Sequence, residues 1–357
     1  MGLACRNGNR NQWGKEMNQL IKPAKLNKGD TVATVSISNG WSGDKDIKWK
    51  YNLGVERLEM LGLNVVAAPN SMKGSDYLTA NPEARAEDIM WTFSNPNIKA
   101  IIANVGGNDS IKAIPYIDPN VLKHNPKIFI GYSDVMNLHL LCYKCGFSSF
   151  YGDNLLYPIA EAQGWHNYSK HWFEKVLFDN STIGDIVPST DWTFEETNYT
   201  DPNYMRNYYS NNDYEVIQGR SIVRGKLFGG HTGLMDLKNT VIETTAQDYK
   251  DSILFIEDIP EFFTPDSIEN FLKWLDSIGA LHVLKGIVIG KLNQNVSFEL
   301  HKEAILKIMR ECYLTDLPIL YGLNFGHSSP ICILPYGAMA EIDCDKKAFT
   351  IVESGVV

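Results

Sequence analysis

The sequence predicts an α/β protein built around parallel β-sheets. Short runs rich in Val and Ile alternate with segments of helical periodicity, a pattern typical of a parallel sheet covered by helices on both faces. The chain has 357 residues, the length of about two domains. Hydrophobic residues make up 44% and charged residues 21%, as in an ordinary globular protein, which excludes a disordered or fibrous chain.

The first half of the chain supplies the clearest elements. Apolar, β-branched runs predict strands at residues 31–38, 63–69, 99–105 and 127–131. Apolar residues at helical spacing predict helices at residues 46–61, 82–94 and 134–145, the last ending at Gly146. The apolar face of the first helix is expected to hold Ile47, Tyr51, Val55, Leu58 and Leu61.

The second half repeats the alternation and ends in a hairpin. Strands are predicted at residues 252–256, 283–289 and 317–323, and helices at residues 264–278 and 298–312. Residues 337–343 and 348–352 flank a Cys-Asp-Lys-Lys turn and predict a terminal hairpin. Two αβ halves of this kind indicate two domains.

Four segments are therefore expected. Residues 1–25 form a polar N-terminal extension, residues 26–180 an N-terminal α/β domain and residues 217–357 a C-terminal β/α domain. Residues 181–216 connect the domains and are rich in Asn, Tyr, Thr, Asp and Trp without periodicity. Long irregular segments are often functional lids or linkers, and the aromatic content argues against plain disorder.

Charge and composition exclude several functions. A net charge of −9 and a pI near 5.4 argue against a protein that binds nucleic acid by neutralising phosphates. No run approaches 18 apolar residues and the N-terminus lacks the apolar core of a signal peptide, so a cytoplasmic location is expected. The six cysteines are scattered and indicate reduced thiols, and no ligand spacing predicts a metal site.

The most informative stretch is a strand that runs into Gly131-Tyr-Ser133, with a helix starting directly after it. A serine at such a turn lies at the carboxyl edge of the sheet, where α/β folds bind ligands. It also lies at a helix N-terminus, which favours an oxyanion. The motif resembles a nucleophile elbow, although it reads Gly-x-Ser-Asp. The alternative is that Ser133 only caps the helix.

Two other strand ends carry suggestive residues. Gly106-Gly107 follows a buried strand, and paired glycines leave backbone N–H groups free as an oxyanion hole requires; an ordinary βα turn is the alternative. Glu257 ends a strand after four apolar residues, where a carboxylate needs a partner such as a histidine. The alternative for Glu257 is a strand-end carboxylate that caps the next turn.

Among the eight histidines, His327 has the most suggestive context, because it follows a strand and a glycine in a loop of small residues. His231, in a Gly-Gly-His-Thr-Gly stretch, is its rival. Ser133, Glu257 and His327 together supply a nucleophile, an acid and a base in one of the known chain orders for such triads. The nucleophile lies in the first half and its partners in the second, which predicts a site between the domains.

The ordered motifs of the chain resemble the LD-carboxypeptidase family of serine peptidases, within it the branch of the microcin C self-immunity proteins. The resemblance runs from about residue 25 to the C-terminus. The motifs that carry it are residues 106–109 (Gly-Gly-Asn-Asp), 116–118, 126–134, 150–152, 225–230, 256–258 and 326–327.

The resemblance implies a role for each site residue. Ser133 is then the nucleophile, His327 the general base and Glu257 its orienting partner, with the oxyanion hole at the backbone N–H groups of Gly107 and Asp134. It also implies a flavodoxin-like N-terminal domain, a swivelling C-terminal β/α domain, commonly a homodimer, and no metal or organic cofactor.

The branch decides the expected substrate. Self-immunity proteins cleave the amide joining an aspartyl group to a modified nucleotide, whereas murein LD-carboxypeptidases release a terminal D-alanine. Gly-Gly-Asn-Asp and the aromatic 188–215 segment favour the first. Asn108, Trp192 and His231 are the candidate substrate-binding residues, with Trp192 stacking on the base or, alternatively, packing between domains. A non-catalytic protein that sequesters a nucleotide-like toxin is the third reading, and the filled triad positions argue against it.

Overall fold

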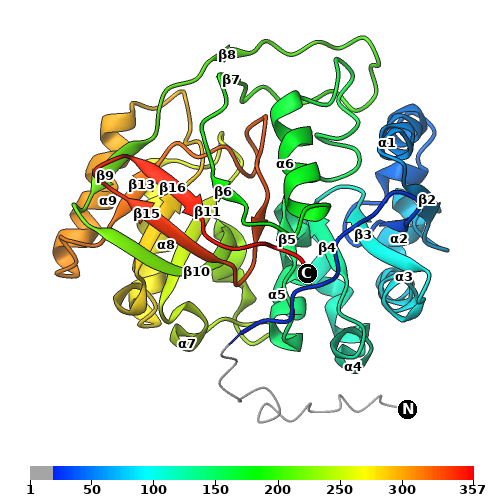
Figure 1. Ribbon diagram of the computed structural model, residues 1–357, viewed down its shortest axis with the longest axis horizontal. Helices are drawn as coiled ribbons and strands as arrows, with labels where there is room; N and C mark the ends of the chain where they lie inside the picture. Colours follow the sequence, from blue (N-terminus) through cyan, green and yellow to red (C-terminus); the bar gives the residue numbers. More distant parts are fainter. Residues whose placement is uncertain (1–18) are drawn as a thin grey trace.

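The computed structural model describes residues 19–357, so that the first 18 residues of the expected 1–25 extension, Cys5 among them, lie outside the described part. Within residues 19–357 the strands form a six-stranded sheet, an eight-stranded sheet and a two-stranded ribbon. Figure 1 shows the first half of the chain (blue to cyan) on one side of the molecule and the second half (yellow to red) on the other. The expected α/β class with two sheets is confirmed.

The first sheet is formed mostly by the first half of the chain. Its strands in spatial order are β14 (Leu334–Pro335), β5 (Phe150–Tyr151), β4 (Ile128–Gly131), β3 (Ile98–Ala103), β1 (Thr31–Val35) and β2 (Asn64–Ala67). The order 2-1-3-4-5 of the parallel strands is that of flavodoxin-like folds. The antiparallel edge strand β14 comes from the second half, so the two halves share this sheet.

The helices around this sheet are α1 (Lys48–Met60), α2 (Ser75–Ala80), α3 (Pro82–Ser94), α4 (Pro119–Lys123), α5 (Met136–Cys145) and α6 (Asn167–Leu177). Three of them, α1, α3 and α5, begin and end near the predicted limits. On the predicted face of α1, Val55 is half-buried and the other four residues are buried. The sequence analysis missed α2, α4 and α6.

The second sheet is mixed. Its strands in order are β6 (Gly184–Asp185), β16 (Ala348–Ile351), β15 (Met339–Asp343), β10 (Ile222–His231), β11 (Ser252–Glu257), β12 (Gly286–Ile289), β13 (Ile319–Tyr321) and β9 (Glu215–Gln218). Strands β10 to β13 are parallel, while β15, β16, β6 and β9 add antiparallel edges. The helices of this half are α7 (Ala246–Tyr249), α8 (Pro265–Ser277) and α9 (Phe298–Glu311). The predicted terminal hairpin is β15–β16.

The segment expected to connect the domains is ordered in the structure. It contains β6, the ribbon of β7 (Asp191–Trp192) with β8 (Tyr209–Ser210), and the start of β9. In Figure 1 the chain between β7 and β8 reaches from the second half toward α1, where the Tyr199 ring packs 4.9 Å from that of Trp41. The domain limits themselves stay a prediction. No helix within residues 19–357 is long and apolar enough to cross a membrane.

Candidate active site

Three strand ends converge where the two sheets meet. Ser133 follows β4 and begins a short 3₁₀ helix, Glu257 is the last residue of β11, and His327 lies in the loop after β13. The carboxyl ends of parallel strands in both sheets thus face the same space, which is where α/β proteins bind ligands.

These three side chains form a continuous chain of hydrogen bonds. The Ser133 hydroxyl lies 2.9 Å from Nε2 of His327, and Nδ1 of His327 lies 2.7 Å from Oε2 of Glu257. The carboxylate at Nδ1 requires a proton on that nitrogen, so Nε2 is left to accept the hydrogen bond that the Ser133 hydroxyl donates. A serine activated in this way by a histidine and an acid has the geometry of a nucleophile.

Ser133 has a strained backbone. Its φ is +71°, a left-handed conformation that non-glycine residues adopt rarely and that clusters at functional sites. Its backbone N–H donates to the Tyr151 hydroxyl at 3.3 Å. The cap position of the 3₁₀ helix is Tyr132, whose side chain makes no capping hydrogen bond. Ser133 is the first residue of this helix and does not cap it. The strained turn therefore presents the Ser133 hydroxyl to His327, as a nucleophile elbow does.

The Glu257 carboxylate is buried, and both of its oxygens accept hydrogen bonds. Oε1 accepts a hydrogen bond of 2.5 Å from the Tyr151 hydroxyl, and Oε2 accepts one of 2.9 Å from the His327 backbone N–H besides the ring contact. Burial acts to raise the pKa of Glu257, but the His327 ring and the donors from His327 and Tyr151 outweigh it and hold the pKa below its ordinary value. Glu257 is therefore an anion that orients the imidazole.

Gly326 makes this contact possible. Its φ is +81°, and a Cβ at this position would overlap the Glu257 carboxylate. Burial acts to lower the pKa of His327, yet the Glu257 carboxylate, with Asp258 nearby, more than offsets burial and raises that pKa above its ordinary value. The result is a histidine that is a stronger base than free imidazole.

Of the paired glycines, Gly106 lies against Ser133 and Gly107 against Ser38 and Asn39. A Cβ on Gly106 would stand 2.7 Å from the Ser133 Cβ and 3.6 Å from the Asp134 nitrogen, and a Cβ on Gly107 would overlap Ser38. The Gly107 N–H makes no hydrogen bond within the described part of the chain, and the Asp134 N–H lies in the first turn of a helix, before its first internal bond. Two free donors beside a serine hydroxyl are suited to bind an oxyanion.

Sequence reasoning missed the residues that hold this loop in place. The Asp134 carboxylate accepts hydrogen bonds from the Ser38 hydroxyl at 2.5 Å and the Ser110 N–H at 2.8 Å. Asp109 is held by the fully buried Arg85 in a two-pronged ion pair of 2.7 and 2.9 Å. The position of Ser38 just past β1, next to β3 in a 2-1-3 sheet, is the signal that identifies it. Arg85 lies within a helix and gives no comparable signal.

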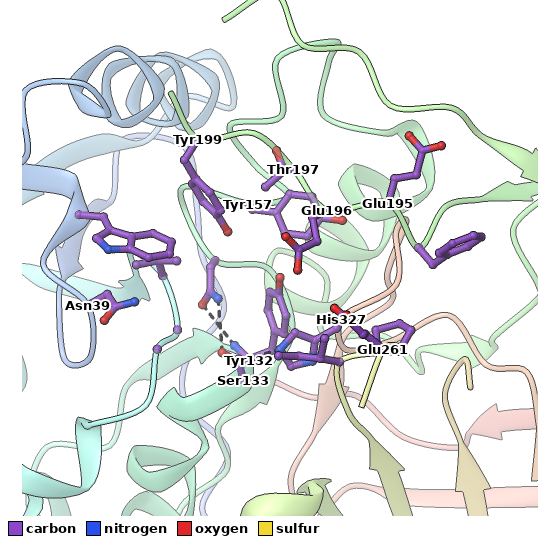
Figure 2. Close-up of a pocket in the computed structure, with 18 of the residues that line it drawn as sticks. Asn39, Tyr132, Ser133, Tyr157, Glu195, Glu196, Thr197, Tyr199, Glu261 and His327 are labelled. Atoms are coloured by element: carbon purple, nitrogen blue, oxygen red, sulfur yellow. Dashed lines mark hydrogen bonds between the residues drawn. The ribbon is translucent and has the colours of Figure 1, made fainter. Parts of the chain in front are cut away.

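A main cavity of about 520 Å³ opens at Ser133 and His327. Figure 2 shows both residues on one side of this cavity, with Tyr199, Thr197 and Glu196 of the connecting segment facing them. Its other walls come from the loops after β1, β3, β11 and β12. The cavity thus lies between the two halves of the chain, as predicted.

The candidate substrate-binding residues lie in different places. Asn108 and His231 line a side cavity of about 280 Å³ that also reaches Ser133 and His327. His231 accepts a hydrogen bond from Gly233 at Nδ1, and its buried Nε2 has no partner in the described part of the chain.

Trp192 does not line the main cavity. It is 8% exposed and faces Lys291, whose ammonium lies 5.1 Å from the ring centroid, in a separate cavity. The backbone on both sides of Trp192 is held by the pairing of β7 with β8 and by the bridge between Thr193 and Ser329, with the Trp192 ring on the side of Lys291. Among residues 19–357 no cluster of three or more His, Cys, Asp or Glu side chains is arranged to hold a metal ion.

Two family models match the chain. The model of the LD-carboxypeptidase N-terminal domain matches residues 32–152, and that of the LD-carboxypeptidase C-terminal domain matches residues 224–342. Together they cover most of the chain, and both contain residues of the site described above.

Individual relatives are similar over nearly their whole length. The "Probable murein peptide carboxypeptidase" of Bacillus subtilis is 28% identical over 94% of this chain and 95% of its own. The crystal structure of an MccF-like protein from Streptococcus pneumoniae in complex with AMP has a TM-score of 0.82 at 30% identity, covering 91% of this chain and 99% of its own. The microcin C7 self-immunity protein MccF in complex with aspartyl sulfamoyl adenosine has a TM-score of 0.83 at 25% identity, covering 94% and 100%.

Proposed function

This chain belongs to the LD-carboxypeptidase family, and from that premise we propose that it is a serine hydrolase that cleaves an amide bond in aminoacyl- or peptidyl-nucleotides of the microcin C type. Such an activity confers self-immunity or detoxification. The observation that carries the proposal is the hydrogen-bonded chain from Ser133 through His327 to Glu257, at 2.9 and 2.7 Å. A cavity of about 520 Å³ beside it has room for a ligand of nucleotide size.

The proposed mechanism uses each group in turn. His327 takes the proton of Ser133 as the hydroxyl attacks the carbonyl carbon of the scissile amide. The N–H groups of Gly107 and Asp134 stabilise the oxyanion that forms, and His327 returns the proton to the leaving nitrogen. Water, deprotonated by His327, then hydrolyses the acyl-enzyme and releases the acid. No metal or organic cofactor takes part.

The nucleotide class is supported by two kinds of observation. Relatives of similar fold were crystallised with AMP and with aspartyl sulfamoyl adenosine. The main cavity has aromatic walls from Trp41, Phe194 and Tyr199, and aromatic faces bind bases by stacking. Asn108 and His231 are proposed to contact the substrate from the side cavity, where the His231 Nε2–H is a free donor. A homodimer and a cytoplasmic location stay predictions.

Replacement of Ser133 by alanine tests the proposal. We expect hydrolysis of aspartyl sulfamoyl adenosine, followed by liquid chromatography, to fall by at least about 10⁴-fold, because the nucleophile is lost. The unfolding temperature should not fall, since the substitution removes only a hydroxyl group at a strained position. Full activity in Ser133→Ala would exclude the mechanism.

A murein LD-carboxypeptidase is the second candidate, favoured by the similarity to the Bacillus subtilis relative. Release of D-alanine from a murein tetrapeptide, measured beside the sulfamoyl substrate, separates the two. The preferred substrate is the one with the larger kcat/KM, and Ser133→Ala should abolish whichever activity is found.

A further inference from the structure

A second cavity lies next to the main one and contains a buried lysine. This Lys291 cavity measures about 450 Å³ and is lined by the β7–β8 ribbon, the end of β12 and the start of α9. Its apolar wall includes the rings of Phe298 and Tyr321, stacked with their centroids 4.6 Å apart. Lys291 itself is only 6% exposed.

The Lys291 ammonium has no anionic partner in the described part of the chain. It donates one hydrogen bond, of 2.7 Å, to Oδ1 of Asn211, and it lies 5.1 Å from the centroid of the Trp192 ring. An ammonium group has three donors, so two remain. Burial lowers the pKa of Lys291 to about 8, because nothing beside it compensates for the lost water. A buried charge without a counter-ion is energetically costly, so buried charged side chains are normally paired with a group of opposite charge.

The acidic and histidine side chains that line this cavity do not form an ion pair with Lys291. Glu215 is paired with Lys302 at 3.3 Å, and Asp213 is exposed at the surface. The His301 ring nitrogens lie 3.1 and 3.0 Å from the backbone carbonyl oxygens of Ser297 and Phe263. None of these groups forms an ion pair with Lys291, so its ammonium faces the cavity without an anion of its own.

The Lys291 cavity adjoins the cavity at Ser133. Phe194, Asn293 and Gln294 line both of them, so the two cavities meet at these side chains. We propose that the Lys291 cavity is an anion subsite, which binds a carboxylate or phosphate group on the part of the substrate remote from the scissile bond. The proposal rests on the proposed function for the bond that is cleaved.

The chemistry fits an oxyanion. Two free N–H donors of an ammonium match two oxygens of a carboxylate or phosphate, and Asn211 holds the ammonium in place through its side-chain oxygen. The stacked aromatic pair supplies an apolar wall, which strengthens the ion pair by excluding water. A neutral group in the same place would leave the ammonium unpaired.

Binding of matched probes tests the subsite without any catalysis. Isothermal titration calorimetry is run with AMP against adenosine and with N-acetylglutamate against the uncharged N-acetylglutamine α-amide, on the wild-type chain and on Lys291→Met. The control is Lys127→Met, because Lys127 is also partly buried with a pKa lowered to about 8 by burial, but it donates to the Thr92 and Asn95 carbonyl oxygens and lines neither cavity.

We expect Lys291→Met to weaken binding of at least one anionic probe tenfold or more and to leave its neutral counterpart unchanged, while Lys127→Met changes neither. Loss for AMP alone identifies a phosphate, and loss for N-acetylglutamate alone a carboxylate. Wild-type affinity for the anionic probe should also fall as the pH rises past about 8, as the ammonium loses its proton, and Lys291→Met should lack this fall.

Equal affinities of wild type and Lys291→Met for both anionic probes would overturn the subsite. The result is independent of the proposed function. If the anionic probes bind through Lys291 but neither the sulfamoyl nucleotide nor the murein tetrapeptide is hydrolysed, the hydrolase proposal fails and the anion subsite stands.

Discussion

Replacing Tyr151 with phenylalanine removes one hydroxyl group that touches both ends of the proposed triad. This hydroxyl donates to Oε1 of Glu257 at 2.5 Å and accepts the N–H of Ser133 at 3.3 Å. Tyr151 is fully buried, so no water replaces the hydroxyl. A hydrogen bond to a buried charge contributes about 1.5–3 kcal/mol, which corresponds to about a tenfold to hundredfold change in an equilibrium or a rate.

The pH profile separates orientation of the triad from simple support of the fold. Without the Tyr151 donor, more negative charge on Glu257 remains to hold the proton of His327, so the pKa of His327, already raised, rises further. His327 acts as a base only when neutral. The acid limb of the kcat/KM profile of Tyr151→Phe should therefore move to higher pH, with the plateau about tenfold to hundredfold lower.

Tyr336→Phe is the matched control. Tyr336 is also fully buried, and its hydroxyl donates at 2.6 Å to the Gly229 carbonyl oxygen, not to Ser133, Glu257 or His327. Both variants should lose about 1–3 kcal/mol of unfolding free energy, since each leaves a buried acceptor without its donor. An unchanged acid limb in Tyr151→Phe, or an equal shift in Tyr336→Phe, would refute the positioning role of Tyr151.

Two further predictions concern packing and charge around the cavity. Gly326→Ala should lower kcat/KM by at least about tenfold and also lower the unfolding temperature, because its Cβ would overlap the Glu257 carboxylate at a φ of +81°. Enzyme assays and thermal unfolding measure both, and wild-type kinetics would contradict the prediction. Glu161→Gln should lower the unfolding free energy, measured in urea, by about 3 kcal/mol. The Glu161 carboxylate lies 2.7 Å from the guanidinium of the buried Arg206, which would lose its counter-ion. A loss below about 1 kcal/mol would show that Arg206 finds another partner.

The strands of the sheet cores were predictable because their residues are buried on both faces. β1, β3, β4, β11 and β12 are nearly continuous runs of Val, Ile, Ala and Phe, the pattern of a parallel strand. β10 was missed although it pairs with β11 along six residues. Its glycines break the apolar pattern, and they are required by packing, since a Cβ on Gly229 would overlap the Phe255 carbonyl and one on Gly230 would overlap Met136.

Pairings between distant short segments were beyond sequence reasoning. β5 and β14 have two residues each and lie more than 180 residues apart, so no local periodicity marks either one. α6 was also missed, although its buried residues Trp172, Phe173, Val176 and Leu177 recur at helical spacing. Local patterns report which face of an element is buried, but they say nothing about which distant segment buries it.

The same difference separates the proposed catalytic groups from the residues that surround the substrate. Ser133, Glu257 and His327 follow strand ends, so the sheets fix their positions and the sequence reveals them. Part of the wall of each cavity comes instead from residues 181–216, which provide Glu196 and Tyr199 at one and Asn211 at the other.

Lys291 shows the consequence of that division. In the sequence it is a lysine just after a strand, where an exposed side chain is expected. It is buried because Trp192 and Asn211 of the connecting segment cover it. The sheets therefore position the proposed catalytic groups, while the connecting segment lines the two cavities beside them. Relatives with a different connecting segment should share the chemistry of Ser133 and differ in the anion, base or peptide that they accept.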